Sequence, residues 1–159
     1  MDRQINKIKY NRKDGEIVID YSILSESTSG GLDEIQASLK SYDEPKPEFI
    51  ATLSTLTSDV EKICSLPIGY CVGADIRGVS FSYKHDVMGA TITALVPVET
   101  ANSPVVINTP FLPSDQYNEG GQAPVLPSET RRKLKLLIVY AKEYVDGDRK
   151  PSNQLSMDL

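Results

Sequence analysis

Apolar side chains recur at the spacing of an α-helix between residues 49 and 63, and this pattern constrains the fold more than any other feature of the chain. Five residues carry the pattern, at intervals of four, three, four and three: Phe49, Leu53, Leu56, Val60 and Ile63. They fall on one side of a helix, and that side must pack against another element. Pro45 and Pro47 precede the helix, which ends near Leu66-Pro67 because a residue before proline avoids the helical region. We therefore predict one helix that covers a sheet.

A second helical pattern occupies residues 128–145. Ser128 suits the N-cap position, and Glu129 places an acid in the first turn. The apolar residues that follow are again helically spaced: Leu134, Leu137, Ile138, Ala141 and Val145. The Asp146-Gly147 pair predicts the end of this helix, because glycine is favoured just after a helix.

Alternating patterns before the first helix predict strands. Residues 8–10 and 17–23 alternate around residues 11–15, whose Asn, Asp and Gly are typical of a hairpin turn. A polar, glycine-containing loop follows at residues 25–31. Residues 35–39 alternate again and predict a third strand, with a helix as the competing interpretation.

Alternation returns after the first helix and predicts a second hairpin. Residues 79–83 and 90–96 alternate on either side of a turn candidate, His85-Asp86. Val105–Ile107 is a further short strand. The segment from Asn108 to Pro127 contains several prolines and glycines and has no period, so we expect a long loop. Long loops inside compact domains are uncommon, and they are usually functional or disordered.

These segments define one fold class. We predict an α+β domain over residues 1–147, with a flexible C-terminal tail at residues 148–159. Its antiparallel sheet has about four to six strands and two helices packed on one face, in the order βββ-α-ββ(β)-α. No internal repeat is visible in the sequence.

Length, composition and cysteine content exclude several classes of protein. The 159 residues fit one domain, and no apolar run approaches the about 20 residues that span a bilayer. The N-terminus is polar rather than an apolar signal segment, so we expect the protein to stay in the compartment where it is made. Cys64 and Cys71 match no zinc or redox spacing and are predicted to be reduced thiols packed as small apolar groups.

Catalytic signatures are missing from the sequence. His85 is its one histidine, which removes most Ser-His-Asp and metal sites. The sequence also has no G-x-S-x-G elbow, Walker loop or dinucleotide-binding glycine pattern. We predict a protein that is not an enzyme and has no cofactor and no metal.

One candidate ligand site combines the second hairpin with the long loop. The hairpin contributes Arg77, Ser80, Ser82, Tyr83, Lys84 and His85, and the loop contributes Asn108, Thr109, Phe111, Gln116 and Tyr117. Aromatic faces together with amide and hydroxyl groups suit a planar, polar ligand or a protein hot spot. Ordinary sheet and loop residues remain the alternative interpretation.

A second candidate site is a basic cluster on the exposed side of the last helix. It consists of Arg131, Arg132, Lys133 and Lys135. Positive charges near a helix N-terminus oppose the helix dipole, which leaves a nucleic-acid site open beside the simpler interpretation of a solubilising surface. Tyr10, Tyr21, Phe81 and Tyr83 are the aromatic residues considered for base stacking. The net charge of −5 makes nucleic acid the less favoured partner.

Five segments together suggest a family. They are Pro45–Ile50, Arg77–Tyr83, Met88–Leu95, Asn102–Pro104 and Tyr144–Arg149. In their residues and in their order along the chain, these segments resemble a family of small uncharacterised phage and prophage proteins. The resemblance covers most of the chain. The resemblance implies expression in the cytoplasm of a host bacterium and a role in binding rather than catalysis. It assigns no functional residue.

Three functions follow as hypotheses. The leading one is a phage accessory protein that binds and neutralises a host factor, either a small nucleotide ligand that signals in immunity or a host defence protein. A single-stranded nucleic-acid-binding protein of phage replication or recombination is the second. The third is a structural or assembly protein that acts as a homo-oligomer through an exposed sheet edge or the long loop.

Overall fold

The computed structural model describes residues 3–118 and 120–150, over which it holds seven strands and three helices. The first half of the chain contains β1 (Arg3–Tyr10), β2 (Ile17–Glu26), β3 (Leu32–Ser41), α1 (Pro47–Ser54) and α2 (Leu56–Ile63). The second half contains β4 (Asp75–Lys84), β5 (Val87–Val96), β6 (Val105–Asn108), β7 (Leu112–Pro113) and α3 (Ser128–Val145).

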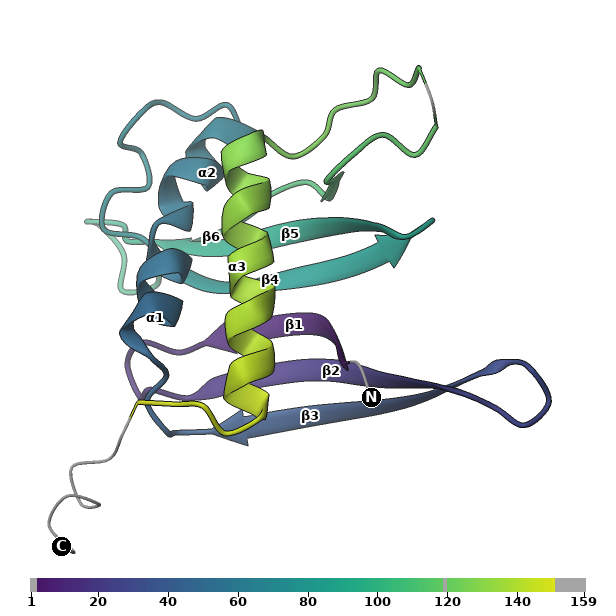
Figure 1. Cartoon of the computed structure of the whole chain (residues 1–159). Helices are drawn as coiled ribbons and strands as arrows, with labels where there is room; N and C mark the ends of the chain where they lie inside the picture. Colours follow the sequence, from purple (N-terminus) through teal and green to yellow (C-terminus); the bar gives the residue numbers. More distant parts are fainter. Residues whose placement is uncertain (1–2, 119, 151–159) are drawn as a thin grey trace, which may run out of the picture.

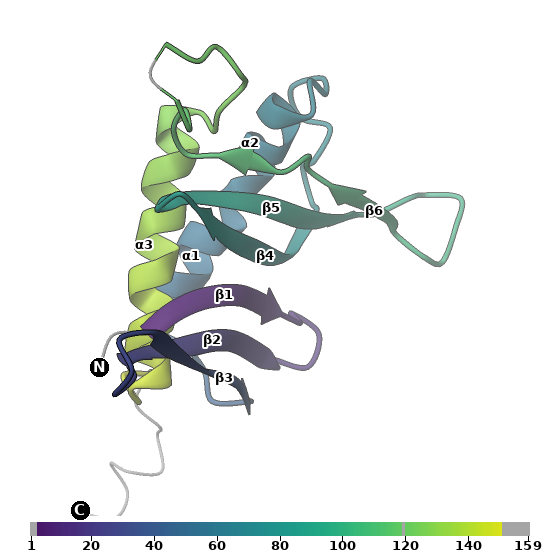
Figure 2. The same ribbon diagram turned by 90° about the vertical axis from the view of Figure 1, so that its right-hand side faces the viewer.

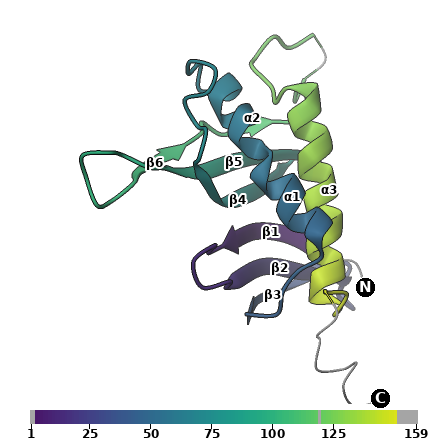
Figure 3. The ribbon, with the colours of Figure 1, turned by 90° about the vertical axis from the view of Figure 1, so that its left-hand side faces the viewer.

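The strands form one antiparallel sheet with the helices on one face (Figure 1). The strand order is β3-β2-β1-β4-β5-β6, and β7 pairs with β5. Figure 3 shows α1 and α2 following one another alongside α3. The predicted α+β class is confirmed: the sheet is antiparallel and its helices share a face.

The core lies between this sheet and the helices. Strand residues at alternate positions point into it, and the predicted helical patterns supply the other wall: Ile5, Ile8, Ile19, Ile92, Phe49, Leu56, Leu134 and Leu137 are 2% exposed or less. The Tyr144 ring packs edge-on against Phe49 with centroids 6.3 Å apart, and its hydroxyl donates to the carbonyl of Asp43. Burial of these apolar faces is the main stabilising contribution to the fold.

Two predicted segments differ in detail. The helix expected over residues 49–63 is two helices that meet at Thr55, whose backbone stays near helical angles (φ −73°, ψ −8°). The apolar side therefore continues across the break, and Phe49, Leu53, Leu56 and Val60 are all buried. The long loop contains β7, a two-residue bridge to β5 that has no periodic signal.

The start of the predicted tail is bonded to the domain. The backbone N–H of Lys150 donates to the carbonyl of Glu44, and Arg149 pairs with Asp43 at 2.6 Å. Residues 151–159, the rest of that predicted tail, lie outside the described residues.

The two halves of the sheet join at β1 and β4 through three residue pairs, centred on Ile8 opposite Val79 (Figure 2). Gly78 faces Lys9 across this junction. A Cβ atom added to Gly78 would lie 2.5 Å from the carbonyl oxygen of Ile8. The close approach of the two strands therefore requires glycine at position 78.

The chain folds as two related halves, although no repeat is visible in its sequence. Each half is a three-stranded meander followed by helix, namely β1–β3 with α1 and α2, and β4–β6 with α3. A β-bulge lies two residues before the junction centre in both halves, at Asn6 before Ile8 and at Arg77 before Val79. If each residue at the junction is replaced by its equivalent in the other half, with Ile8 and Val79 changing places, the three β1–β4 residue pairs stay the same. The repeat is thus a property of strand pairing and not of residue identity.

Candidate functional site

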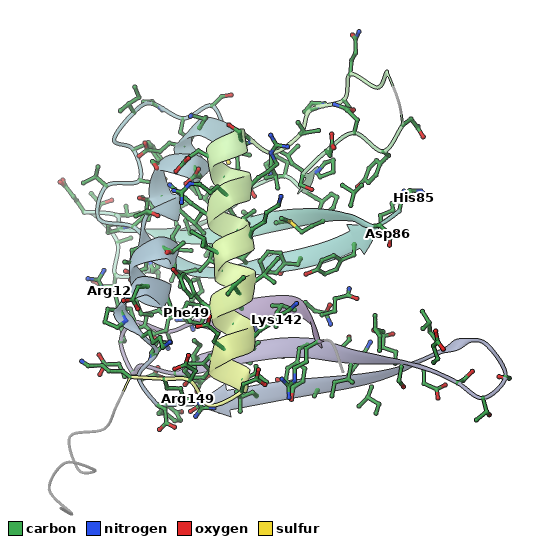
Figure 4. The ribbon with its side chains drawn as sticks, in the orientation of Figure 1. Arg12, Phe49, His85, Asp86, Lys142 and Arg149 are labelled. Carbon is green, nitrogen blue, oxygen red and sulfur yellow. The ribbon has the colours of Figure 1, made fainter. Side chains whose placement is uncertain are left out.

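The structure brings together only part of the predicted ligand site. Lys84 and His85, at the end of the β4–β5 hairpin, lie against Tyr117 of the loop: the Lys84 Nζ is 5.5 Å from the Tyr117 ring centroid and the His85 ring centroid is 5.9 Å away. Figure 4 shows His85 and Asp86 at the free end of this hairpin. Arg77 is seven residues before Lys84 on the extended strand β4, about 23 Å distant. These side chains therefore do not share one small pocket.

Other members of the predicted ligand site have structural partners. The Tyr83 hydroxyl donates to the carbonyl of Ile5 at 2.7 Å, and burial raises the pKa of Tyr83 to about 12. Buried Thr109 accepts the backbone N–H of Ile92 through its hydroxyl. The Gln116 amide donates to the carbonyl of Ala123.

Phe111 and Ser82 lie next to each other at Gly89. The Phe111 ring lies over Gly89, where an added Cβ would be 2.2 Å from its Cζ atom. Ser82 is exposed on β4 directly opposite Gly89, so its side chain lies on the same face of the sheet as the Phe111 ring. Asn108 is on β6 and accepts a hydrogen bond from the Thr93 hydroxyl. These contacts give Phe111 and Asn108 structural roles in the loop and the sheet.

The basic cluster of α3 is largely engaged within the molecule, and its expected position on the exposed side is wrong for two members. Arg131 donates to the carbonyl of Ser114 and is only partly exposed, while its Nε atom is buried without a partner. The Lys133 ammonium is 2.6 Å from the Asp59 carboxylate, and the two side chains are 12% and 6% exposed. Arg132 and Lys135 are exposed, and Arg132 pairs with Glu129. The position of Lys133 within its own helix could not show that α2 places the Asp59 carboxylate against it.

A different polar surface covers the side of the sheet opposite the helices, which we name the open face. The strand register places the following residues on it: Lys7, Lys9, Val18, Asp20, Ser22, Gln36, Ser38, Lys40, Gly78, Ser80, Ser82, Thr91, Thr93 and Asn108. Most carry a hydroxyl, an amide or a charge. The helices cannot cover this surface because they lie on the other face (Figure 1).

Three cations lie at the centre of the open face. Lys7 and Lys9 are alternate residues of β1, about 7 Å apart. Arg77 is the extra residue of the β4 bulge and adjoins Gly78, which faces Lys9. Asn6 holds the equivalent bulge position in β1, and its amide donates to Ser22 on the open face. Because Arg77 holds the same bulge position as Asn6, we infer that its side chain also lies on the open face.

Among the described residues, these cations have no carboxylate partner. Within residues 3–118 and 120–150, no ion pair involves Lys7, Lys9 or Arg77. Asp20 stands opposite Lys7 in the register, but its carboxylate accepts the Ser38 hydroxyl at 2.6 Å. The centre of the open face is therefore positive, although the chain as a whole carries a net charge of −5.

Carboxylates border this positive centre on the β1–β3 side. A shallow depression of about 700 Å³ lies there, lined in part by Asn6, Asp20, Glu34, Gln36 and Ser38. A chain of hydrogen bonds runs from the Asn6 amide to the buried Ser22 hydroxyl and on to Glu34, at 2.7 and 2.8 Å. The acids accept hydrogen bonds from neighbours and are held in place on the surface.

Four aromatic residues considered for stacking point away from the open face. Tyr10, Tyr21, Phe81 and Tyr83 occupy core-facing positions of their strands and pack against the buried cluster. They cannot stack on bases laid across the open face.

A smaller cleft of about 300 Å³ opens where β1 and β4 separate beyond their junction. Its lining includes Arg3, Ile5, Tyr83, Asp86 and Lys142. Figure 4 shows Lys142 on α3 and Asp86 at the hairpin end. The cleft combines two cations and the Asp86 carboxylate with apolar side chains, and its volume is at the lower size limit of small-molecule sites.

Comparison with protein-family models, with curated proteins and with solved structures finds no match for the chain. Within the described residues, no group of three or more His, Cys, Asp or Glu side chains is placed to hold a metal ion, and no helix is long and apolar enough to cross a membrane. Cys64 and Cys71 are free thiols whose pKa values burial raises.

Proposed function

We propose that the protein binds single-stranded nucleic acid across the open face of its sheet. The observation that carries the proposal is the positive centre formed by Lys7, Lys9 and Arg77, which have no ion-pair partner in residues 3–118 and 120–150. An ammonium or guanidinium group without a carboxylate partner is available to a phosphate. Nucleic acid offers such phosphates at regular intervals along a flexible chain.

The surroundings of the three cations support an extended ligand. Hydroxyl groups continue the polar surface from the centre toward β5, through Ser80, Thr91 and Thr93. Short hydroxyl side chains hydrogen-bond to phosphate oxygens, sugars or base edges. A ligand that crosses several strands would meet both the cations and these hydroxyls.

Charge density favours a single strand over a duplex. A duplex carries a phosphate charge about every 1.7 Å of its axis, twice the density of one strand. The open face offers few unpaired cations, and Asp20 and Glu34 border them. Repulsion by these carboxylates opposes a duplex more strongly than a single strand.

The proposal predicts binding that is electrostatic and tolerant of base sequence. Three phosphate contacts give a slope of about −2 for the logarithm of affinity against the logarithm of salt concentration. A fourfold rise in salt then weakens binding about 16-fold. Stacking by Tyr10, Tyr21, Phe81 and Tyr83 contributes little because these four rings face the core, which leaves the exposed Phe111 ring over Gly89 as a stacking partner on this face.

The test is fluorescence anisotropy with labelled oligothymidylate for the wild-type protein and two matched double variants. Lys7→Glu/Lys9→Glu reverses two charges on the open face, and Lys62→Glu/Lys135→Glu reverses two exposed charges on the helices. We expect the first variant to weaken binding at least about tenfold, and the second to bind nearly as well as wild type. Equal losses in the two variants, or affinity that does not change with salt, would contradict the proposal.

A second candidate function rests on the cleft near Tyr83. Arg3 and Lys142 line it beside apolar side chains, which suits a small anionic ligand of the kind that a protein sequestering a nucleotide-type signal would hold. Such a ligand would compete with the ion pair between Arg3 and Asp146. Native mass spectrometry of protein purified from a bacterial host tests this candidate. A co-purified nucleotide that Tyr83→Ala fails to retain supports it, and an empty wild-type protein counts against it.

A further inference from the structure

Strand β3 is a long edge of the sheet, and its register with β2 runs without a bulge. Its ten residues, Leu32–Ser41, pair with β2, and β3 is the last strand in the sheet order. An unpaired edge exposes a row of backbone donors and acceptors, and proteins usually shorten such edges or interrupt them with proline. No proline occurs in β3.

The opposite edge shows the usual protection. Strand β6 has four residues, and Pro104 and Pro110 flank it. By contrast, β3 carries large exposed apolar side chains: Leu32 is 70% exposed and Ile35 is 58% exposed. Tyr42, just after the strand, is 61% exposed. Exposed apolar groups beside unpaired backbone favour association with another strand.

The sequence of β3 is complementary to itself when two copies run antiparallel with Ala37 opposite Ala37. Glu34 then faces Lys40 of the second copy, and by symmetry this ion pair forms twice. On the other side of the sheet, Ile35 faces Leu39. Opposite charges and apolar pairs placed directly across an antiparallel ladder stabilise it.

This register is preferred over its neighbours. A shift of two residues is the smallest that keeps the same faces of the two sheets together. Such a shift places Lys40 opposite Leu32 in one direction or opposite Gln36 in the other. Both ion pairs are lost in either case, so the charges select the register centred on Ala37.

We propose that two copies of this chain associate through β3, in an antiparallel register centred on Ala37, to form one continuous sheet. The intrachain partners of the charged residues do not prevent this contact. Lys40 is 3.4 Å from Glu16 and its side chain remains 62% exposed, while Glu34 uses one oxygen to accept the Ser22 hydroxyl. The proposal is independent of what the open face or the cleft binds.

A charge-swap experiment tests the ion pairs. Sedimentation velocity over a range of concentrations measures dimerisation of wild type, Glu34→Lys, Lys40→Glu and the double variant. Each single change puts like charges opposite one another twice, and we expect it to weaken the dimer about tenfold or more. The double variant restores opposite charges and should dimerise like wild type. A wild-type protein that is monomeric throughout, or a double variant no better than the singles, would overturn the proposal.

A disulfide experiment tests the register and does not depend on charge. Residue 37 meets itself at the two-fold axis with Cα atoms about 5 Å apart, a distance that a disulfide spans. Ala37→Cys should therefore form a covalent dimer under mild oxidation. Gln36→Cys should not, because residue 36 faces Ser38 of the second copy and lies beyond disulfide reach of its own equivalent. Equal cross-linking of the two variants, or cross-linking at residue 36 alone, would refute the register.

Discussion

The ion pair between Lys133 and Asp59 links α3 to α2, and its removal should be one of the most destabilising single changes in the protein. The two charged groups are 2.6 Å apart in side chains that are 12% and 6% exposed. Asp59 also accepts the hydroxyl of buried Thr130, and Lys133 also donates to the carbonyl of Thr55. Both carboxylate oxygens of Asp59 thus have a partner on α3, and the Lys133 ammonium donates both to α2 and to the residue just before it.

The magnitude follows from this burial. Lys133→Met keeps the length of the side chain but leaves the Asp59 carboxylate charged and buried, which costs about 3–5 kcal/mol of unfolding free energy. With a urea m-value of about 2 kcal/mol/M, the unfolding midpoint falls by about 1.5–2.5 M. A partner substitution, Asp59→Asn, removes that charge and keeps an oxygen for Thr130. The Asp59→Asn/Lys133→Met double variant should therefore recover about 1–3 kcal/mol relative to Lys133→Met.

Urea denaturation followed by circular dichroism measures these differences. The control is Lys135→Met, a change of the same chemistry at an exposed position of the same helix. Its free energy of unfolding should stay within about 0.5 kcal/mol of wild type. If Lys133→Met costs no more than the control, the burial argument fails. If the double variant is less stable than Lys133→Met, the assignment of the cost to an unpaired carboxylate fails.

Two further predictions concern β4 and its turn. Burial raises the pKa of Tyr83 to about 12, so its protonated form stabilises the fold below pH 10, and this stability is lost as pH rises through 12. Tyr83→Phe should flatten the pH dependence of melting above pH 10 and cost about 1 kcal/mol at neutral pH; an unchanged profile would contradict this. His85 and Asp86 have φ angles of 53° and 60°, so His85→Asn/Asp86→Gly should raise stability by about 1 kcal/mol in thermal melts; a lower melting temperature would contradict it.

The elements predicted from the sequence were those with a sustained period. Alternation of five residues or more identified β2–β5, whereas for β1 it marked only residues 8–10 of Arg3–Tyr10. The apolar spacing that begins at Phe49 continued through Thr55 because that residue keeps nearly helical angles. The same continuity concealed the break between α1 and α2. Strand β7 was not predicted because a two-residue bridge has no period.

The surfaces were harder to predict because they depend on strand order. Lys7 and Lys9 belong to a basic stretch that the sequence does show, but Arg77 joins them only because β1 pairs with β4. The two bulges direct Asn6 and Arg77 to the open face, and one extra residue leaves no signal in an alternating pattern. Lys133 appeared to be solvent-exposed because its partner Asp59 comes from a distant helix.

The equivalence of the two halves bears on how such a chain could arise. The β1–β4 junction would also be satisfied by two separate copies of a half-length chain, since exchanging the halves leaves its register unchanged. Duplication and fusion of such a gene produces this strand order with one new connection, between α2 and β4. Once fused, the copies can diverge: position 7 is lysine, whereas its equivalent at position 78 is glycine. Each half then keeps the residue that its own side of the junction requires.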